Sequence, residues 1–439
     1  MTATDMVPAQ PDPEAVLAKR RRLGPMARGE ARLAMAMLLP TFFIVFAIVL
    51  LPLIANFWIS VKPVRLDDLR PASPVVSERP RGDMDVAGGP FTIEYRLRNT
   101  SRDDPIADVS LTDTLPKGLS VQSADERCAV DGRDIACELG DYEPGFRETV
   151  ELQVVPDEAF AASPVSPRDS EPVMAGTAPN VLTNFHFTLE NFARIFDSAE
   201  FWGVLWVTLT YTIIGTLGAL VLGLFAAQLL NTEFFGRSWL RGLFLFPYVA
   251  PVIAVAFTWV VLLDPFSGTF NAILQRMALT DHGINFFGQR AVELNLFGLT
   301  VNFPLALSSV IAFEAWRYFP LSFLFILARM QSISTEMYEA AEVDGASPFQ
   351  VFWHISLPQL LGILSTLFLL RFIWTFNKFD DIFLLTGGAA GTRTLTVSVY
   401  EQGFALANLG AGAAVAVVVF LFLLAFAMAY FRFVHQEEG

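Results

Sequence analysis

Long apolar runs, separated by polar segments, dominate the hydropathy pattern along this chain of 439 residues. A helix needs about 20 mainly apolar residues to cross the hydrocarbon core of a membrane. Runs of this kind occur at 34–61, 202–230, 240–263, 304–329, 358–377 and 408–431. The pattern therefore predicts six transmembrane helices and an all-α polytopic membrane protein, with both ends of the chain on the same side.

Prolines interrupt some of these runs. Pro40 and Pro52 lie in the first run, and Pro247 and Pro251 lie in the third. Neighbouring helices can satisfy the carbonyl groups that a proline leaves free within a membrane, so kinks are expected at these positions. The first run is about twice as long as the apolar core of a signal peptide, and no small-residue cleavage site follows it. It is expected to remain as an anchor.

The composition agrees with membrane insertion. Hydrophobic residues make up 53% of the chain and charged residues 17%, with 41 phenylalanines, whereas soluble proteins carry about 45–50% apolar and about 25% charged residues. This excludes a disordered or fibrous chain. Two cysteines and four histidines are too few for a zinc ribbon or an iron–sulfur protein, and no metal site is indicated.

The distribution of charge predicts the orientation of the spans. Residues 1–33 hold six basic residues, four of them adjacent at 19–22, whereas 62–200 holds 26 acidic and 14 basic residues. A basic cluster beside a span stays in the cytoplasm, so the tails 1–33 and 433–439 are expected inside and the acidic segment outside. Lys378 and Arg393 then lie outside, against the general trend. An acidic external segment also argues against nucleic acid as a partner.

The external insert 62–200 contains a predicted β domain. Apolar and polar side chains alternate in FTIEYRLRN (91–99) and TVELQVV (149–155), which is typical of half-buried strands. DVSLTDTLPKGLSV (108–121) reads as a strand, a turn and a second strand. The strings TDTLPKGLSV and CELGDYEPG resemble the immunoglobulin-like repeat of bacterial surface proteins. This resemblance implies a seven-stranded sandwich at about 88–156.

Cys128 and Cys137 both fall within this domain, with eight residues between them. On the oxidising side of a membrane they can form a disulfide; two free thiols are the alternative. Neither cysteine has a nearby histidine that would make it a nucleophile, so their role is structural in both cases. The domain could contact an extracytoplasmic solute-binding protein or could be a passive insertion.

The longest cytoplasmic loop carries the most specific motif. Residues 339–358 read EAAEVDGASPFQVFWHISLP. This string resembles the EAA loop in the permease subunits of binding-protein-dependent ABC importers, and the resemblance extends over about 190–435. LENFARIF (189–196), AFEAWRYFP (312–320), FNKFDDIFLLTGG (376–388) and TRTLTVSVYEQGF (392–404) are similar to the carbohydrate-uptake branch, close to the larger maltose-type permease subunit.

The resemblance implies the fold of an ABC importer permease over 201–432, in a bacterial inner membrane. It implies four kinds of partner: a second homologous permease subunit, two cytoplasmic ATPase subunits, an extracytoplasmic solute-binding protein and membrane lipid. The chain itself is expected to have no enzymatic activity.

The coupling loop 335–358 is expected to begin with a short helix. Met337, Ala340, Ala341 and Asp344 recur at helical spacing, and Gly345 suits a left-handed end to the helix. By resemblance this helix occupies a groove of the ATPase subunit; an ordinary amphipathic connecting helix is the alternative. The residues assigned to coupling are Tyr338, Glu339, Ala340, Ala341, Asp344 and Gly345.

The chain has no motif for binding ATP. A P-loop ends in Lys followed by Ser or Thr, but the four lysines, Lys19, Lys62, Lys117 and Lys378, are followed by Arg, Pro, Gly and Phe. ATP must therefore be bound and hydrolysed by a separate subunit, and no cofactor is expected in this chain.

Ionisable residues lie on one face of each of two spans. Glu314, Arg317, Tyr318 and Leu321 share a face of the fourth span, and Arg371, Thr375 and Lys378 share a face of the fifth. Such groups at membrane depth are costly and usually face a cavity or one another. By resemblance, these positions line a sugar pocket. The charges at 314, 317 and 378 and the hydroxyl at 375 differ from the maltose-type pattern, which puts maltose itself in doubt. Structural pairing of Glu314 with Arg317, or of Arg371 with Asp380, is the alternative.

The predicted function is ATP-driven import of a sugar, such as an oligosaccharide or α-glucoside. A permease for another solute, such as a glycerol phosphate or a polyamine, would share all features outside the pocket. Of these two solutes, the basic side chains of Arg317, Arg371 and Lys378 favour the anionic glycerol phosphate. A membrane-embedded enzyme would need clustered carboxylates or a metal motif, and an adhesin-like anchor would not explain the EAA spacing.

Overall fold

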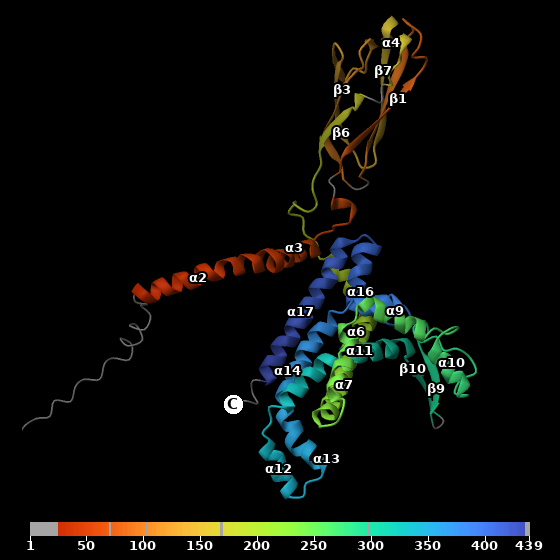
Figure 1. Ribbon diagram of the computed structural model, residues 1–439. Helices are drawn as coiled ribbons and strands as arrows, with labels where there is room; N and C mark the ends of the chain where they lie inside the picture. Colours follow the sequence, from red (N-terminus) through yellow and green to blue (C-terminus); the bar gives the residue numbers. More distant parts are fainter. Residues whose placement is uncertain (1–24, 70–71, 102–103, 167–169, 297–298, 435–439) are drawn as a thin grey trace, which may run out of the picture. The chain divides into compact units, whose positions relative to one another are not determined.

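The computed structural model describes residues 25–69, 72–101, 104–166, 170–296 and 299–434 (Figure 1). The basic cluster at 19–22, most of the predicted tail 1–33 and residues 435–439 of the predicted tail 433–439 lie outside these residues. The chain divides into two compact units, one ending at Trp58 and the other beginning at Ile59, and each is described by itself.

The first unit is an apolar helix. It comprises α2 (Pro25–Val45), a π-helical turn at Phe46–Leu50 and the start of α3 (Leu51–Ser60). The N–H of Leu51 donates to the carbonyl of Phe46, which is the wide hydrogen bond of a π-turn. This turn directly precedes Pro52, a residue that cannot donate a helical hydrogen bond. The helical stretch Arg32–Ser60 is long and apolar enough to cross a membrane.

The insert folds into two antiparallel four-stranded sheets, ordered β1-β2-β7-β4 and β5-β6-β3-β8. Side chains from both sheets, such as Ile93, Leu111 and Val154, form one buried core. The strands are β1 (Pro74–Arg81), β2 (Phe91–Asn99), β3 (Ile106–Thr114), β4 (Leu119–Ser123), β5 (Cys128–Asp131), β6 (Asp134–Tyr142), β7 (Arg147–Pro156) and β8 (Val173–Thr177), with the short helix α4 (Glu158–Ala162) after β7.

The predicted seven strands over 88–156 are therefore wrong in number and extent. Six strands, β2 to β7, lie within that range, and two, β1 and β8, lie outside it. Both are edge strands of their sheets, where Pro74 and Pro80 of β1 are tolerated because one side of an edge strand needs no ladder hydrogen bonds. The strand–turn–strand prediction for 108–121 is correct for the elements, but β3 and β4 belong to different sheets.

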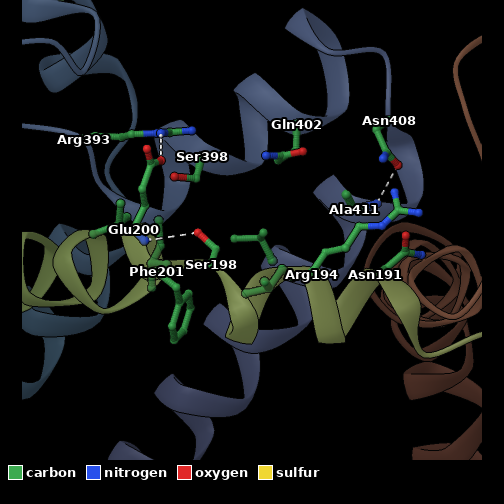
Figure 2. Close-up of a pocket in the computed structure, with 14 residues that line it drawn as sticks. Asn191, Arg194, Ser198, Glu200, Phe201, Arg393, Ser398, Gln402, Asn408 and Ala411 are labelled. Carbon is green, nitrogen blue, oxygen red and sulfur yellow. Dashed lines mark hydrogen bonds and ion pairs between the residues drawn. The ribbon is translucent and has the colours of Figure 1, made fainter.

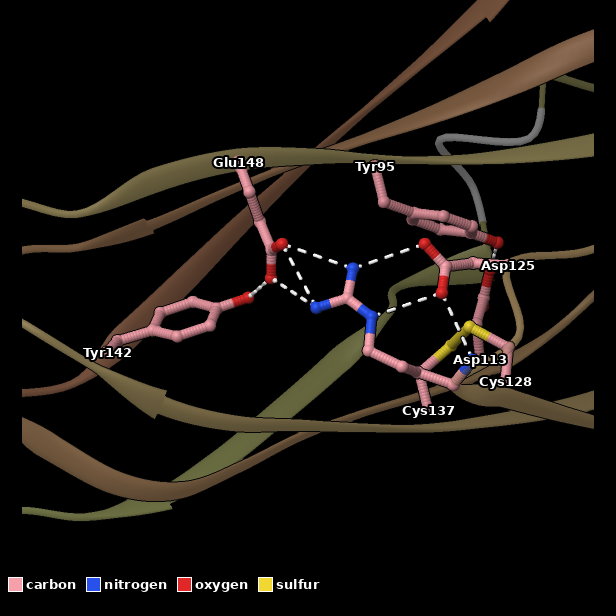
Figure 3. Close-up of a disulfide and its surroundings, with 8 residues drawn as sticks. Tyr95, Asp113, Asp125, Cys128, Cys137, Tyr142 and Glu148 are labelled. Carbon is pink, nitrogen blue, oxygen red and sulfur yellow. Dashed lines mark hydrogen bonds and ion pairs between the residues drawn. A yellow bond between two sulfur atoms is a disulfide. The ribbon is translucent and has the colours of Figure 1, made fainter.

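A disulfide joins Cys128 on β5 to Cys137 directly opposite on β6 (Figure 3). Beside it, Arg127 binds Asp125 at 3.0 Å and Glu148 of the other sheet at 3.1 Å. The Tyr142 hydroxyl also donates to Glu148. These contacts connect the two sheets at the end where the disulfide lies.

The remaining elements form a helical core. It contains α5 (Glu190–Asp197), α6 (Ala199–Asn231), α7 (Arg237–Phe244), α8 (Phe246–Val249), α9 (Val252–Leu262), α10 (Thr269–Arg276), α11 (Leu305–Met330), α12 (Thr335–Val343), α13 (Pro348–Val351), α14 (Leu357–Phe376), α15 (Asp380–Thr386), α16 (Leu395–Tyr400) and α17 (Leu409–Val434). A hairpin of β9 (Val292–Leu296) and β10 (Leu299–Phe303) precedes α11; it was not predicted from the sequence.

Five of the six predicted spans are uninterrupted helical stretches in the described part of the chain. The fifth runs without a break from Pro348 to Phe376, through α13, a π-turn and α14. The third, predicted as one helix over 240–263, is instead broken: the helices on either side of Ala250 and Pro251 meet at 93°. Hydropathy identified this apolar segment, but it carries no information on the continuity of the backbone.

Helices α6 and α11 pack closely because α6 presents glycines to α11. A Cβ atom at Gly223 would lie 2.6 Å from the Cβ of Ser322, and one at Gly215 would lie 3.0 Å from the Cγ of Glu314. Small residues of this kind allow two membrane helices to approach closely. The glycine at 215 therefore leaves the space that the Glu314 side chain occupies.

Candidate functional site

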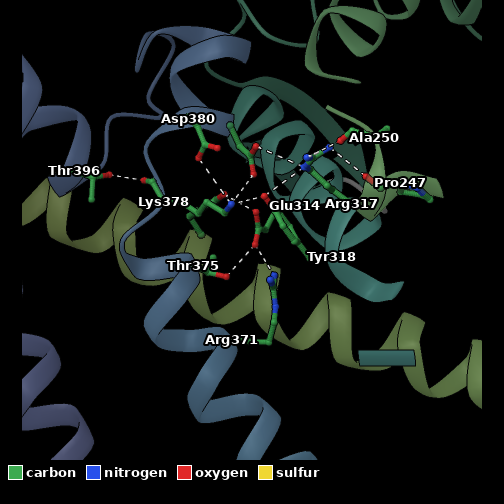
Figure 4. Close-up of polar contacts among 12 residues, drawn as sticks. Pro247, Ala250, Glu314, Arg317, Tyr318, Arg371, Thr375, Lys378, Asp380 and Thr396 are labelled. Atoms are coloured by element: carbon green, nitrogen blue, oxygen red, sulfur yellow. Dashed lines mark hydrogen bonds and ion pairs between the residues drawn. The ribbon is translucent and has the colours of Figure 1, made fainter. Parts of the chain in front are cut away.

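Glu314 is the centre of a buried polar cluster (Figure 4). Its Oε1 accepts from Arg371 Nη2 at 2.5 Å and from Thr375 Oγ1 at 2.9 Å, both on α14. Its Oε2 accepts from the hydroxyl of Tyr211 on α6 at 3.0 Å. Three donors from two other helices thus satisfy one carboxylate at membrane depth, where an unpaired charge would be very unfavourable.

Arg317 lies one turn further along α11 and turns toward the broken span. Its Nη1 donates to the carbonyl of Pro247 at 3.2 Å, and its Nη2 donates to the carbonyl of Ala250 at 3.2 Å. In an unbroken helix the carbonyl of Pro247 would accept from the N–H of residue 251, but Pro251 has no N–H. Arg317 therefore satisfies a carbonyl that the proline leaves free, the kind of compensation expected for a broken span.

Lys378 and Tyr318 form the more accessible part of the cluster. Lys378 Nζ contacts the Tyr318 hydroxyl and lies 3.8 Å from Asp380 and 3.7 Å from Asp381. The ring of Tyr318 lies 4.2 Å from Lys378 Nζ and 4.6 Å from the guanidinium carbon of Arg371, within cation–π range. Asp381 is fully buried and lies 3.9 Å from Arg317.

The structure brings together six of the seven residues assigned to the pocket. Leu321 lies one turn beyond Tyr318 on α11 and is half-buried. Both alternative pairings named the wrong partner. Glu314 was expected to pair with Arg317, and Arg371 with Asp380, but Glu314 and Arg371 pair with each other. Arg317 is drawn away from Glu314 by the free carbonyls of the broken span.

Two members of the cluster were not among the predicted site residues. Tyr211 stands between Thr210 and Thr212 in the mainly apolar α6, and this short polar segment was a weak signal in the sequence. Asp381 is the second residue of the short helix α15, outside every predicted span. With Asp380 and Asp381 included, the three carboxylates of the cluster match its three basic side chains in number. Among the described residues, no three His, Cys, Asp or Glu side chains gather where they could hold a metal ion.

The predicted coupling helix is α12, which ends in a well-defined cap. The N–H of Gly345 donates to the carbonyl of Glu342 at 3.0 Å, and the N–H of Ala346 donates to that of Ala341 at 2.9 Å. This is the Schellman pattern. It requires the left-handed conformation that Gly345 adopts, with φ of +74°, and no atom lies within 4 Å of where its Cβ would be. The helix ends at Val343, just before the left-handed end that was predicted at Gly345.

One contact attaches this loop to the start of α14, and a second group of contacts joins the two spans that flank the loop. The Tyr338 hydroxyl lies 3.1 Å from the Ser356 hydroxyl, just before α14. Arg329, in the last turn of α11, donates to the carbonyl of Gln359 at 3.2 Å and to its side chain at 3.3 Å. Glu339, Ala340 and Gly345 are exposed, whereas Tyr338 and Ala341 are half-buried.

Residues 219–436 match the family described as "Binding-protein-dependent transport system inner membrane component". The trehalose/maltose transport system permease MalF of Thermococcus litoralis is 32% identical over 222 residues, which cover 51% of this chain and 70% of that protein. The chain belongs to this family of ABC transporter permeases. The sn-glycerol-3-phosphate permease UgpA of Salmonella choleraesuis is 29% identical over 255 residues, 57% of this chain and 80% of that protein.

The permease fold also has a solved counterpart. A chain in the crystal structure of a bacterial alginate ABC transporter, in complex with its alginate pentasaccharide-bound periplasmic protein, superimposes with a TM-score of 0.50 at 20% identity. The match covers 57% of this chain and 83% of that one. The family and the long apolar helices together establish a multi-pass membrane permease with the helical fold of ABC importers, as the EAA loop and the spans predicted.

Proposed function

We propose that this permease imports a sugar, such as an oligosaccharide or α-glucoside, across a bacterial inner membrane. Its solute would be delivered by an extracytoplasmic solute-binding protein. A second homologous permease subunit would complete the pathway, and two cytoplasmic subunits would bind and hydrolyse ATP. The buried charge cluster and the exposed coupling loop support this proposal.

The observation that carries the proposed coupling is the apolar surface of the loop that contains α12 and α13. Val343 is 89% exposed and Phe349 is 72% exposed, and Met337 and Trp353 are also exposed. Exposed apolar side chains that gather on a loop outside the spans are typical of a protein-binding surface. The groove of an ATPase subunit would cover them, with Glu339 and Ala340 at the contact.

A mechanical path leads from this loop to the charge cluster. The helical stretch that begins at Pro348 continues to Phe376 and carries both Arg371 and Thr375. The Tyr338–Ser356 contact joins α12 to the start of α14. ATP-driven movement of α12 would therefore shift α14 along or about its axis, and would change how Arg371 and Thr375 meet Glu314.

The cluster has two parts that we propose have different roles. Glu314, Arg371 and Thr375 are at most 1% exposed and satisfy one another, which suits a link that holds α11 to α14. Lys378 and Leu321 are half-buried, and Tyr318 and Arg317, at 8% and 6% exposed, are less deeply buried than the residues of that link. These would meet the solute, with the aromatic faces of Trp316 and Trp374 available to stack on sugar rings.

The equal numbers of acidic and basic groups favour an uncharged sugar. The basic side chains that would attract an anion are already paired with carboxylates, so a phosphate would have to displace one of them. A glycerol phosphate permease remains the second candidate because UgpA is similar over much of the chain and because Lys378 is partly accessible.

We also propose that the β domain is an extracytoplasmic immunoglobulin-like sandwich. Its two packed sheets share one core, and its disulfide is typical of an oxidising compartment.

Purification from native membranes in a mild detergent tests the assembly. Mass spectrometry should identify a P-loop ATPase, a second EAA-bearing permease and a solute-binding protein, whose sugar can then be screened. Val343→Asp should lose the ATPase, whereas Glu336→Gln on the same helix should retain it. Glu339→Lys should abolish uptake while the protein remains inserted; wild-type uptake in this variant would contradict the assigned coupling role.

A further inference from the structure

A cavity of about 230 Å³ lies between α5, α6, α16 and the start of α17 (Figure 2). It is separate from the charge cluster and from the coupling loop. Its polar lining includes Asn191, Arg194, Glu200, Arg393, Gln402 and Asn408.

The cavity changes from polar to apolar along two spans. Ser198 and Glu200 line it where α6 begins, and Val204 lines it further along the same helix. On α17, Asn408 precedes the helix and Val415 lies about 10 Å deeper. Both helices therefore place hydrogen-bonding groups at the outer end of the cavity and apolar side chains toward the membrane interior. This is the polarity gradient of a lipid, from headgroup to acyl chain.

Aromatic side chains around the cavity indicate the level of the membrane interface. Trp202 is 63% exposed and Trp206 is 70% exposed, both in the first turns of α6, and Phe196 on α5 is exposed as well. Tryptophans of membrane proteins concentrate at the headgroup level. Phe201, which lines the cavity, packs against Phe196 and Trp202. The cavity thus lies at the depth where lipid headgroups are present.

Arg194 is the basic side chain of the lining that an anion would meet. Arg393 forms ion pairs with Glu200 at 2.9 Å and with Glu401. These two carboxylates balance its charge and hold its side chain in place. Arg194 pairs with Glu190, one turn earlier on α5, in a pair that is largely exposed. An exposed pair of this kind contributes little, and the guanidinium can therefore bind a phosphate as well. The amide of Gln402 and the hydroxyl of Ser398 line the same space.

We propose that this cavity binds the headgroup of an anionic phospholipid. The phosphate would pair with Arg194, a headgroup hydroxyl would hydrogen-bond Gln402 or Ser398, and an acyl chain would follow Val204 and Val415. Because the glycerol phosphate of a lipid and free glycerol phosphate share this chemistry, the test must separate the two. The proposal does not depend on which solute is transported.

The test uses the purified full-length transporter, stripped of lipid and titrated with phosphatidylglycerol or phosphatidylcholine, with bound lipid counted by native mass spectrometry. Arg194→Gln should weaken phosphatidylglycerol binding roughly tenfold, as expected for loss of one charge-assisted contact. The matched control is Arg237→Gln: Arg237 also forms an i,i+4 pair with a glutamate, Glu233, but at the other end of α6. It should bind lipid as the unmodified protein does.

A second variant and a competition experiment complete the test. Val204→Trp fills the apolar end and should also reduce lipid binding, even if Arg194→Gln fails to fold. Free glycerol phosphate at millimolar concentration should not displace the lipid; if it does, the cavity is a site for a soluble solute and the proposal is wrong. Equal binding of the two lipids, or equal loss in the Arg194 and Arg237 variants, would also overturn it.

Discussion

Glu314 on α11 and Arg371 on α14 form an ion pair of 2.5 Å that is excluded from solvent on all sides. A buried pair of this kind contributes little compared with well-packed apolar residues, but breaking it leaves an uncompensated charge. The pair therefore determines how α11 and α14 can sit against each other, and it makes the cluster sensitive to any movement of α14.

Removing one partner of this pair should be much worse than removing both. Arg371→Leu should destabilise the permease by about 3–5 kcal/mol because Glu314 is left buried and unpaired. The double variant Glu314→Leu/Arg371→Leu should recover most of this loss. Thermal unfolding of the detergent-solubilised protein measures both effects. If the double variant is as unstable as the single one, the pair is not the reason for the instability.

The Schellman cap of α12 predicts a conformational requirement at position 345. The space around Gly345 is open, so the cost of a substitution comes only from the left-handed backbone, about 1–2 kcal/mol for most residues. Gly345→Val should therefore loosen the end of α12 and reduce ATP-driven uptake. Gly345→Asn should retain uptake, because asparagine tolerates this conformation. Equal uptake in both variants would show that the cap is not needed for coupling.

Two arginines face each other on the outer surface of the β domain. Arg98 on β2 and Arg147 on β7 are direct cross-strand neighbours, and both are exposed. Like charges in this position are destabilising, so Arg147→Thr should stabilise the domain by roughly 0.2–1 kcal/mol.

The control for that variant lies on the same face. Arg96→Thr should destabilise the domain, because Arg96 binds Glu94 at 3.0 Å. Hydrogen–deuterium exchange of residues 91–99 and 147–156 in the full-length chain measures both changes. Slower exchange in the Arg96 variant would contradict this account of the charges.

The ion pair of Asp125 predicts that the β domain loses stability at acid pH. Hydrogen bonds from the side chain and the backbone N–H of Arg127 lower the pKa of Asp125 below its ordinary value. The stability that this carboxylate contributes is therefore present above its unfolded pKa, about 3.9, and is lost as the pH falls through the lower, folded value. Protection from exchange in β5 should decrease below about pH 4, and Asp125→Asn should show a smaller decrease. An identical pH dependence would exclude this ion pair as a cause.

The sequence was sufficient to predict the spans because their length and apolarity are set by the membrane itself. It did not reveal the 93° break at Pro251, since an apolar segment has the same composition whether its backbone is straight or bent. The hairpin of β9 and β10 and the edge strands β1 and β8 were also missed. Short or proline-containing edge strands have little of the alternation that marks β2 and β7.

For the candidate site, the sequence predicted which residues share a helix face, but it did not predict which residues form ion pairs between helices. Helical spacing alone placed Glu314, Arg317 and Tyr318 together on α11. Spacing within one helix carries no information on partners across helices, so the pairing of Glu314 with Arg371 could not be derived. The role of Arg317 depends on carbonyls freed by the break after Ala250, which was itself not predicted.

The central claim is that α12 docks on an ATPase subunit that drives transport. A photo-crosslinking residue placed at Val343, in transporter purified from native membranes, tests this claim most directly. The account predicts a specific adduct with a P-loop ATPase, which should disappear when Val343 is probed in a Glu339→Lys background. Adducts with lipid alone, in a preparation that still transports its solute, would contradict it.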